Sequence, residues 1–247
     1  MSAQTRPRGA LRIDARLLVG LRGPDLVATT ARLALVDKMG FGDRLAGLQR
    51  YDFFHFVLEG DGPAEAQVDG LTRVLARQST FYNRNKHMYS LECGWDGGSC
   101  HDGPTRDDLG RRFGALLGTQ WERSRSDSDG TGIDFDGKGG SKADIVNTYP
   151  VFRVEVAVQD DDSASRDGIA AKLTRELSGS GSGTSRVQCP GRATVWWLGI
   201  AARDEAAAME TARRIAVTKR RDAGLLMNPN YQRADFVSAG RVDRVRS

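Results

Sequence analysis

The sequence has few cysteines, few histidines and no long apolar run. Cys93, Cys100 and Cys189 are the only cysteines among 247 residues, and so sparse and odd a set argues against a disulfide framework and for a reducing compartment. No apolar segment is long enough to cross a bilayer. Arg6 and Arg8 lead directly into a strand-like segment, without the apolar core of a signal peptide. We therefore expect a cytoplasmic protein with no membrane partner.

The residues that are present have the composition of an ordinary globular protein, with 39% hydrophobic and 28% charged side chains. A chain of 247 residues accommodates two units of about 80 to 100 residues each. The formal net charge of +4 is mildly basic. It favours contact with nucleotides, phosphorylated metabolites or nucleic acid, but it does not select among them.

The apolar pattern of the first half predicts strands and helices in alternation. Residues 13–21 alternate as a strand does, and residues 26–39 repeat at helical spacing up to Gly40, which suits a C-cap. Residues 45–58 are aromatic and β-branched, as in two adjacent strands or one bent hairpin. A second helix at 64–76 and a last strand at 81–91 complete this half.

The second half repeats the order. Residues 151–158 alternate strictly, and Ser165 is a plausible N-cap for the helix that follows. Strand material occupies 187–202, a helix is predicted over 205–221, and residues 234–237 can close the sheet.

Both halves therefore have the order βαββαβ, which predicts an α+β fold of two tandem ferredoxin-like units with antiparallel sheets. The first unit is expected at 11–93 and the second at 150–240. The Gly-, Asp- and Ser-rich segment 94–149 between them is expected to be a linker or insert. Each sheet would have one bare face, so two copies in one chain can pair as a pseudo-dimer.

Two phrases carry a resemblance to a known family. Residues 34–41 read Ala-Leu-Val-Asp-Lys-Met-Gly-Phe before the central strands, and residues 225–231 read Leu-Leu-Met-Asn-Pro-Asn-Tyr after the last helix. In these phrases and in its order of elements the chain resembles the small subunit of phosphoribosylformylglycinamidine synthase (PurS). Each copy has half of the signature: the first reads Leu-Ala-Arg-Gln-Ser-Thr at 75–80 in place of the Asn-Pro phrase. The second has a Ser-Gly run at 178–183 in place of the Gly-Phe phrase.

The tandem is similar to the N-terminal region of the large, single-chain form of that synthase, in which two such units mimic a small-subunit dimer. The resemblance implies an accessory component of purine biosynthesis that bridges synthase-like and glutaminase-like subunits, with no catalytic residue and no cofactor of its own. A homo-oligomer and a phosphorylated, nucleotide-like ligand are further expectations.

An RNA-binding or RNA-processing protein is the alternative, because tandem ferredoxin-like units with basic surfaces also occur in CRISPR-associated RNA endonucleases. An enzyme that uses a cleft between the units also stays open. The segment before residue 90 mixes aromatic and cationic side chains, as ligand-binding surfaces for nucleotides do. Its candidate ligand-binding residues are Tyr82, Arg84, Lys86, His87 and Tyr89. On an alternating strand the same pattern is one packed face and one solvated face.

The remaining motifs favour structural interpretations. The acidic string at 127–136 begins like a calcium loop, but Lys138 stands where the bidentate Glu is required. The Ser-Gly run at 178–184 lacks the Lys-Ser/Thr ending of a phosphate loop and favours a flexible connection. Asn228 and Pro229 are expected to form a structural corner.

Cysteine and histidine spacing does not define a reactive centre. Cys93, Cys100 and His101, with His87 nearby, lack the paired knuckle of zinc sites, so no metal is expected. Cys93 with a histidine is not surrounded by a nucleophile signature either. An accessory subunit is therefore favoured over an independent catalyst.

Overall fold

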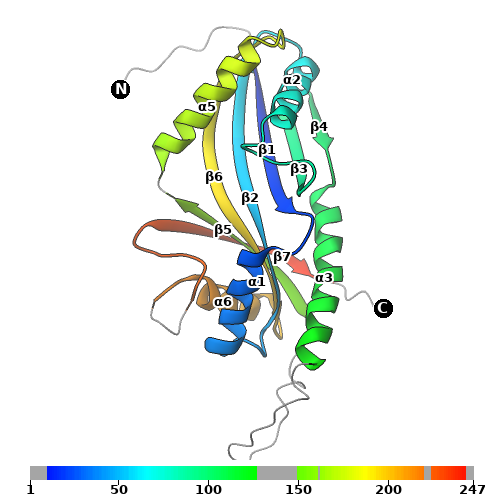
Figure 1. Ribbon diagram of the computed structural model, residues 1–247, viewed down its shortest axis with the longest axis vertical. Coiled ribbons are helices and arrows are strands. Elements are labelled where there is room, and N and C mark those ends of the chain that lie inside the picture. Colours follow the sequence, from blue (N-terminus) through cyan, green and yellow to red (C-terminus); the bar gives the residue numbers. More distant parts are fainter. Residues whose placement is uncertain (1–9, 127–148, 161, 220–223, 243–247) are drawn as a thin grey trace, which may run out of the picture. The chain divides into compact units, whose positions relative to one another are not determined.

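The computed structural model describes residues 10–126, 149–160, 162–219 and 224–242, which form a mixed α+β chain with one seven-stranded antiparallel sheet (Figure 1). The strands are β1 (Leu11–Leu21), β2 (Leu45–Gly60), β3 (His87–Trp95), β4 (Gly98–Asp102), β5 (Val151–Asp160), β6 (Thr184–Ala201) and β7 (Gln232–Arg241). The helices are α1 (Leu26–Leu33), its π-helical continuation η1 (Ala34–Lys38), α2 (Ala64–Arg77), α3 (Arg106–Ser126), α5 (Ser163–Ser178) and α6 (Glu205–Ala216). Across these ranges, none of the helices has the length and apolarity that a membrane span requires.

The strand order is β4-β3-β1-β2-β6-β5-β7. β1 pairs antiparallel with β2 and with β3, and β5 pairs antiparallel with β6 and with β7. β2 and β6 are antiparallel too, because the Asp61 N–H donates to Gly183 O where β2 ends, while the Ala201 N–H donates to Arg44 O where β2 begins.

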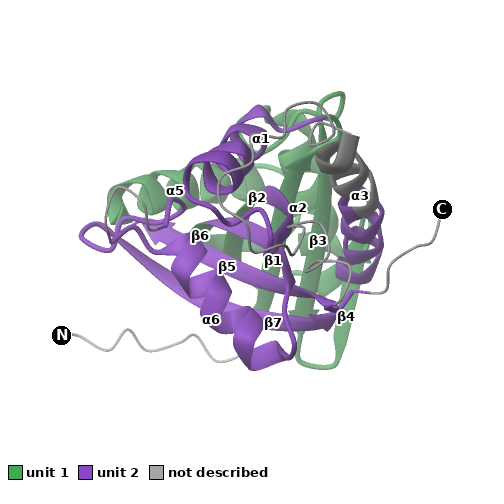
Figure 2. Cartoon of the chain, turned by 90° about the horizontal axis from the view of Figure 1, so that it is seen from below, with its two compact units in different colours: residues 1–23, 51–105, 161–193 green, residues 24–50, 106–160, 194–247 purple. Residues whose placement is uncertain are grey.

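The chain divides into two compact units, and each unit takes segments from both halves of the sequence (Figure 2). The first unit comprises residues 1–23, 51–105 and 161–193, and the second comprises 24–50, 106–160 and 194–247. β2 and β6 each contribute residues to both units. The repeats that the sequence pattern places at 11–93 and 150–240 therefore differ in their boundaries from the compact units.

The core of the first unit lies on one face of its strands. Ile13, Ala15, Leu17 and Val19 alternate along β1 and pack with the buried side chains of β2, because successive residues of a strand point to opposite faces. α2 and α5 cover this face through side chains such as Leu71 and the two leucines of α5. Leu71 is fully buried, which stabilises the fold by about 2–3 kcal/mol.

The second unit has helices on both faces of its strands. Trp196, Leu198 and Ile200 of β6 pack in one core with the alanine-rich face of α6. Trp197 points to the opposite face, where the ring of Phe113 in α3 meets it edge-on at 5.9 Å between centroids. α3 and β4 belong to the segment predicted as a linker, of which residues 127–148, with the calcium-like string, lie outside the described residues.

Several local predictions differ from the structure. Residues 45–60 form one continuous strand and no hairpin. α6 ends at Ala216, because Val217 adopts an extended conformation and bridges to Met227. The N-cap of α5 is Asp162, whose carboxylate accepts the Ser165 N–H at 2.9 Å. Gly40 follows the first helix at φ 73°, a conformation that glycine adopts without strain, which confirms its predicted role.

Candidate functional site

The predicted ligand-binding residues lie at the start of β3, where two of them pack against each other. The Tyr82 and Tyr89 rings stack at 4.4 Å between centroids, and Tyr82 is buried. The Tyr89 hydroxyl donates to Asp102 at 2.7 Å. Burial, and then this hydrogen bond, raise the pKa of Tyr89 above its usual range. Tyr82 is therefore a core side chain, Tyr89 is partly buried against the same core, and only Arg84 and Lys86 of the set are exposed.

Residues 83–87 form a hydrogen-bonded turn and not the strand that the pattern predicted. Asn83 Oδ1 accepts the Asn85 N–H at 2.9 Å, and Asn83 O accepts the N–H groups of Lys86 and His87 at 3.0 and 2.7 Å. The His87 Nδ1 atom accepts the Asn83 N–H at 2.9 Å. His87 thus closes the turn with one ring nitrogen.

The same turn recurs in the second copy. Asn228 Oδ1 accepts the Asn230 N–H at 3.0 Å, and Asn228 O accepts the N–H groups of Tyr231 and Gln232 at 3.1 and 2.9 Å. Gln232 Oε1 accepts the Asn228 N–H at 2.9 Å, as His87 does for Asn83. The Asn-x-Asn corner therefore occurs twice, at 83–87 and 228–232. In the first copy this corner lies after residue 80, and not at residues 75–80, where the sequence pattern had placed its equivalent.

A second corner also recurs, at the end of the first helix of each copy. Gly40 at φ 73° precedes buried Phe41, and Gly181 at φ 69° precedes buried Ser182. Ser182 Oγ donates to Leu177 O, and the Thr184 hydroxyl donates to Oε1 of Gln67, which is fully buried. The Ser-Gly run is thus fastened to the first unit by its own side chains, contrary to the flexible connection that its composition favoured.

The polar face of the first unit carries two of the three histidines. Register places His55 opposite Arg16, Arg16 opposite Glu92, and Glu92 opposite His101. Directly opposed residues share a face of the sheet, so these four form one polar row across β2, β1, β3 and β4. The His101 Nε2 atom lies 3.3 Å from the hydroxyl of Ser90.

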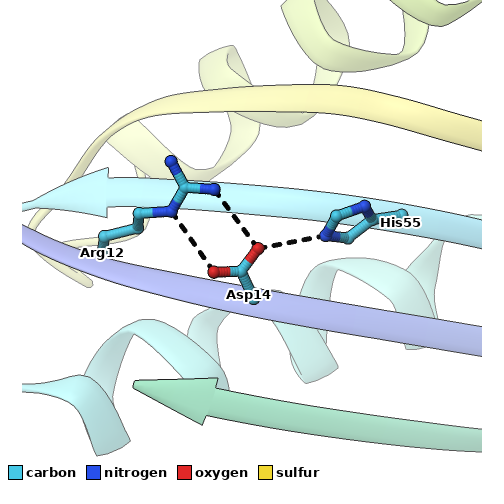
Figure 3. A network of polar contacts seen from close by, with 3 residues as sticks. All are labelled: Arg12, Asp14 and His55. Carbon is cyan, nitrogen blue, oxygen red and sulfur yellow. Dashed lines mark hydrogen bonds and ion pairs between the residues drawn. The ribbon is translucent and has the colours of Figure 1, made fainter. Parts of the chain in front are cut away.

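Asp14 joins this row to a second arginine (Figure 3). Its carboxylate accepts hydrogen bonds from Arg12 Nε at 3.2 Å and lies 3.1 Å from His55 Nε2. The Arg12 hydrogen bond lowers the pKa of Asp14, partial burial opposes it, and His55 adds to the lowering. An ionised carboxylate can only accept, so His55 Nε2–H is the donor in this contact. An aspartate–histidine pair beside two arginines can hold an anion or transfer a proton.

Sequence patterns did not identify this group, because Asp14 and His55 are 41 residues apart in the chain. A usable signal was present. Alternation places Arg12, Asp14 and Arg16 on the polar side of β1, and His55 lies between the buried Phe54 and Phe56 of β2.

A cluster of charged side chains around the buried Glu155 lies in the second unit, between α3 and β5. Arg106 donates to Glu155 at 2.8 Å, Arg153 lies 3.7 Å from the same carboxylate, and the Arg153 guanidinium stacks over Trp197 at 4.5 Å from the ring centroid. Glu155 is buried, so its charge requires these partners. This cluster fastens α3 to the sheet and does not form an open site.

The cysteines and histidines do not converge on a metal. In the described part of the chain, no group of three or more His, Cys, Asp or Glu side chains is arranged to hold an ion. Cys93 and Cys100 are on the side of β3 and β4 that faces the first core, whereas His101 is on the polar face. Burial raises the pKa of Cys93 and of Cys189, so both thiols are mostly protonated near neutral pH.

Comparison with known proteins gave no match: no family model, no curated protein and no solved structure matches this chain.

Proposed function

We propose that the chain is a pseudo-dimer of two ferredoxin-like units and acts as an accessory assembly component related to the PurS small subunit. The observation that carries the proposal is the twofold recurrence of the two turns in which the phrases of the resemblance lie. The Gly-Phe corner at Gly40 has a counterpart at Gly181, and the corner at Asn228 has a counterpart at Asn83 with matching hydrogen bonds. Each copy thus has the full pair of corners.

The ferredoxin-like interpretation is supported by the segments that build each unit. The first unit has β1, residues 51–60 of β2, α2 and β3 from the first repeat, with α5 and residues 184–193 of β6 from the second. Together these segments supply the four strands and two helices of a βαββαβ unit, although their order along the chain is β1-β2-α2-β3-α5-β6. In return, the second unit contains α1 and the beginning of β2, which come from the first repeat. Each unit is therefore proposed to be complete only through this exchange.

An assembly role requires a surface for a large protein, and α1 offers one. Leu26, Val27 and Leu33 are exposed to 76%, 50% and 49%. Leu26 and Leu33 are seven residues apart, which places them on one side of the helix. Apolar side chains gathered in this way are typical of protein contacts. The matching helix α5 has no large hydrophobic side chain with comparable exposure.

The test is reconstitution with the synthase and glutaminase proteins from the same source. We expect the three proteins to elute as one complex and ammonia-dependent amidation to become glutamine-dependent only when this chain is present. The double variant Leu26→Asp and Leu33→Asp is expected to weaken assembly at least tenfold while thermal unfolding stays unchanged. Ala164→Asp on exposed α5 is the matched control. Failure of the wild-type chain to join the complex overturns the proposal.

The polar row supports nucleic-acid binding as a second candidate. Arg16, His55 and His101 of this row, with the neighbouring Arg12, lie on one sheet face beside the carboxylates of Asp14 and Glu92, and these basic side chains can contact phosphates. Binding of single-stranded RNA that weakens steeply with salt and is lost in Arg16→Ala supports this candidate. RNA affinity that Arg16→Ala leaves unchanged excludes this face.

A further inference from the structure

Two free cysteines face each other across adjacent strands. Cys93 in β3 is directly opposite Cys100 in β4, and both are reduced. Directly opposed residues of an antiparallel pair have Cα atoms about 4.5–5.5 Å apart, which is inside the range of about 4.4–6.8 Å that a disulfide spans. The backbone therefore does not have to move for a bond to form.

The side chains are also positioned for it. Both cysteines point toward the core of the first unit, from directly opposed positions on the two strands. Cys93 is buried, whereas Cys100 is partly exposed and belongs to a strand whose side chains are largely open to solvent. A small oxidant can therefore reach Cys100 first.

We propose that Cys93 and Cys100 form a reversible disulfide in exchange with a low-molecular-weight disulfide such as oxidised glutathione. The Cys100 thiolate attacks one sulfur of the oxidant, which releases one reduced thiol and leaves a mixed disulfide on Cys100. The Cys93 thiolate then attacks the Cys100 sulfur and releases the second thiol. The two cysteines lose two protons and two electrons, and the oxidant becomes two thiols.

The bond would fix β4 on the edge of β3. β4 has only five residues, and outside its ladder with β3 it is held to that strand by Asp102 and His101. β7 is the counterpart of β3 in the second repeat, and it ends the sheet with no further strand among the described residues. Within the described ranges only the first repeat thus has a covered edge, and oxidation would hold that cover in place until the disulfide is reduced.

The charges around the pair make the exchange slow at neutral pH. Burial raises the pKa of Cys100, the contact with Cys93 lowers it in part, and the carboxylates of Asp102 on β4 and of Asp69 and Glu65 on α2 each add a smaller increase. The reactive thiolate is therefore scarce below the raised pKa and becomes more abundant as pH rises. The rate is expected to increase about tenfold for each pH unit between 7 and 8, as the thiolate fraction does.

The experiment is incubation of the full chain with oxidised glutathione, followed by thiol counting after denaturation. Three free thiols are expected to fall to one. Cleavage at tryptophan cuts after Trp95, which stands between the two cysteines, and should leave the fragments that carry Cys93 and Cys100 linked until a reductant is added. Amide hydrogens of β4 should exchange more slowly in the oxidised protein.

Two variants make the result specific. Cys189→Ser should still form the bond, and Cys100→Ser should prevent it without changing the fold, which far-ultraviolet circular dichroism checks. A stable glutathione adduct on Cys100, a bond from Cys93 to Cys189, or three unreacted thiols would each overturn the inference. The outcome does not depend on the proposed assembly role.

Discussion

Gly110 is in α3 at a position where any side chain would meet Arg153. A Cβ there would overlap the Nη1 atom of Arg153, whose guanidinium stacks on Trp197. Gly110→Ala is therefore expected to displace Arg153 and to lower the free energy of unfolding by about 1–2 kcal/mol, despite the better helix propensity of alanine. Gly168→Ala is the matched control, because Gly168 in α5 has open space around it and should gain about 0.5–1 kcal/mol. Urea unfolding of both variants checks the prediction, which fails if Gly110→Ala is the more stable.

The Asp14 carboxylate is expected to make stability depend weakly on pH. Because its pKa is lowered in the folded protein by the Arg12 hydrogen bond, it stabilises the fold above its unfolded pKa. That contribution is lost as pH falls through the lowered value. Arg12 and Asp14 are nearly half exposed, so Asp14→Asn should cost less than about 1 kcal/mol at pH 7. Unfolding measured from pH 7 to pH 2 should show this difference disappear in acid, and a constant difference contradicts the prediction.

The recurring corner gives an element-scale prediction. His87 and Gln232 accept the same backbone N–H in the two copies, so His87→Gln should preserve the turn. His87→Ala leaves the Asn83 N–H without that acceptor and should cost about 1 kcal/mol. Thermal unfolding of the two variants distinguishes them. Equal melting temperatures would mean that water replaces the imidazole without loss.

Leu225 and Leu226, which precede the Asn228 corner, should differ sharply in how much each contributes to stability. Leu226 is 8% exposed and packs in the second core, whereas Leu225 is 40% exposed. Leu226→Ala is expected to cost about 2–5 kcal/mol, and Leu225→Ala under about 1 kcal/mol. Chemical unfolding of both proteins is the measurement, and similar costs would show that Leu226 is not a core residue in solution.

Periodicity predicted most strands and helices because alternating and helical patterns report which side chains are buried. β5, β6 and α2 follow their predicted ranges closely. The corners were harder to place, because the Asn-x-Asn turn depends on side chains such as His87 and Gln232 that look unrelated in sequence. The polar row could not be found from spacing alone, since its four members come from four strands.

At the scale of the whole molecule, the exchange of segments could not be read from the sequence. Residues 45–60 would show the same apolar–polar alternation in a hairpin as in one long strand. The two arrangements differ only in which other segments the first and second halves of this stretch pack against. Long-range packing decides between them: Leu45 and Leu48 join the second core, whereas Phe54 and Phe56 join the first.

The exchange predicts that neither repeat folds alone. A fragment of residues 1–148 lacks α5 and β6, and a fragment of 149–247 lacks α1 and β2. Each fragment is expected to be aggregated or to lose cooperative unfolding, and co-expression of both should restore one soluble complex. Size-exclusion chromatography and calorimetry provide the readout. Cooperative unfolding of an isolated fragment would show that a repeat can close on its own segments.

The order in which the segments of the first unit leave the ribosome has a consequence for synthesis in the cell. The first unit uses residues up to 105, none of the residues 106–160, and then residues 161–193, which complete it. At about 5–20 residues per second, synthesis from residue 105 to residue 193 takes roughly 4–18 s, during which the apolar face around Phe54 and Phe56 is not yet covered by α5 and β6. During that interval it is open to chaperones, so translation speed between these two points should govern how much of the chain reaches its native state.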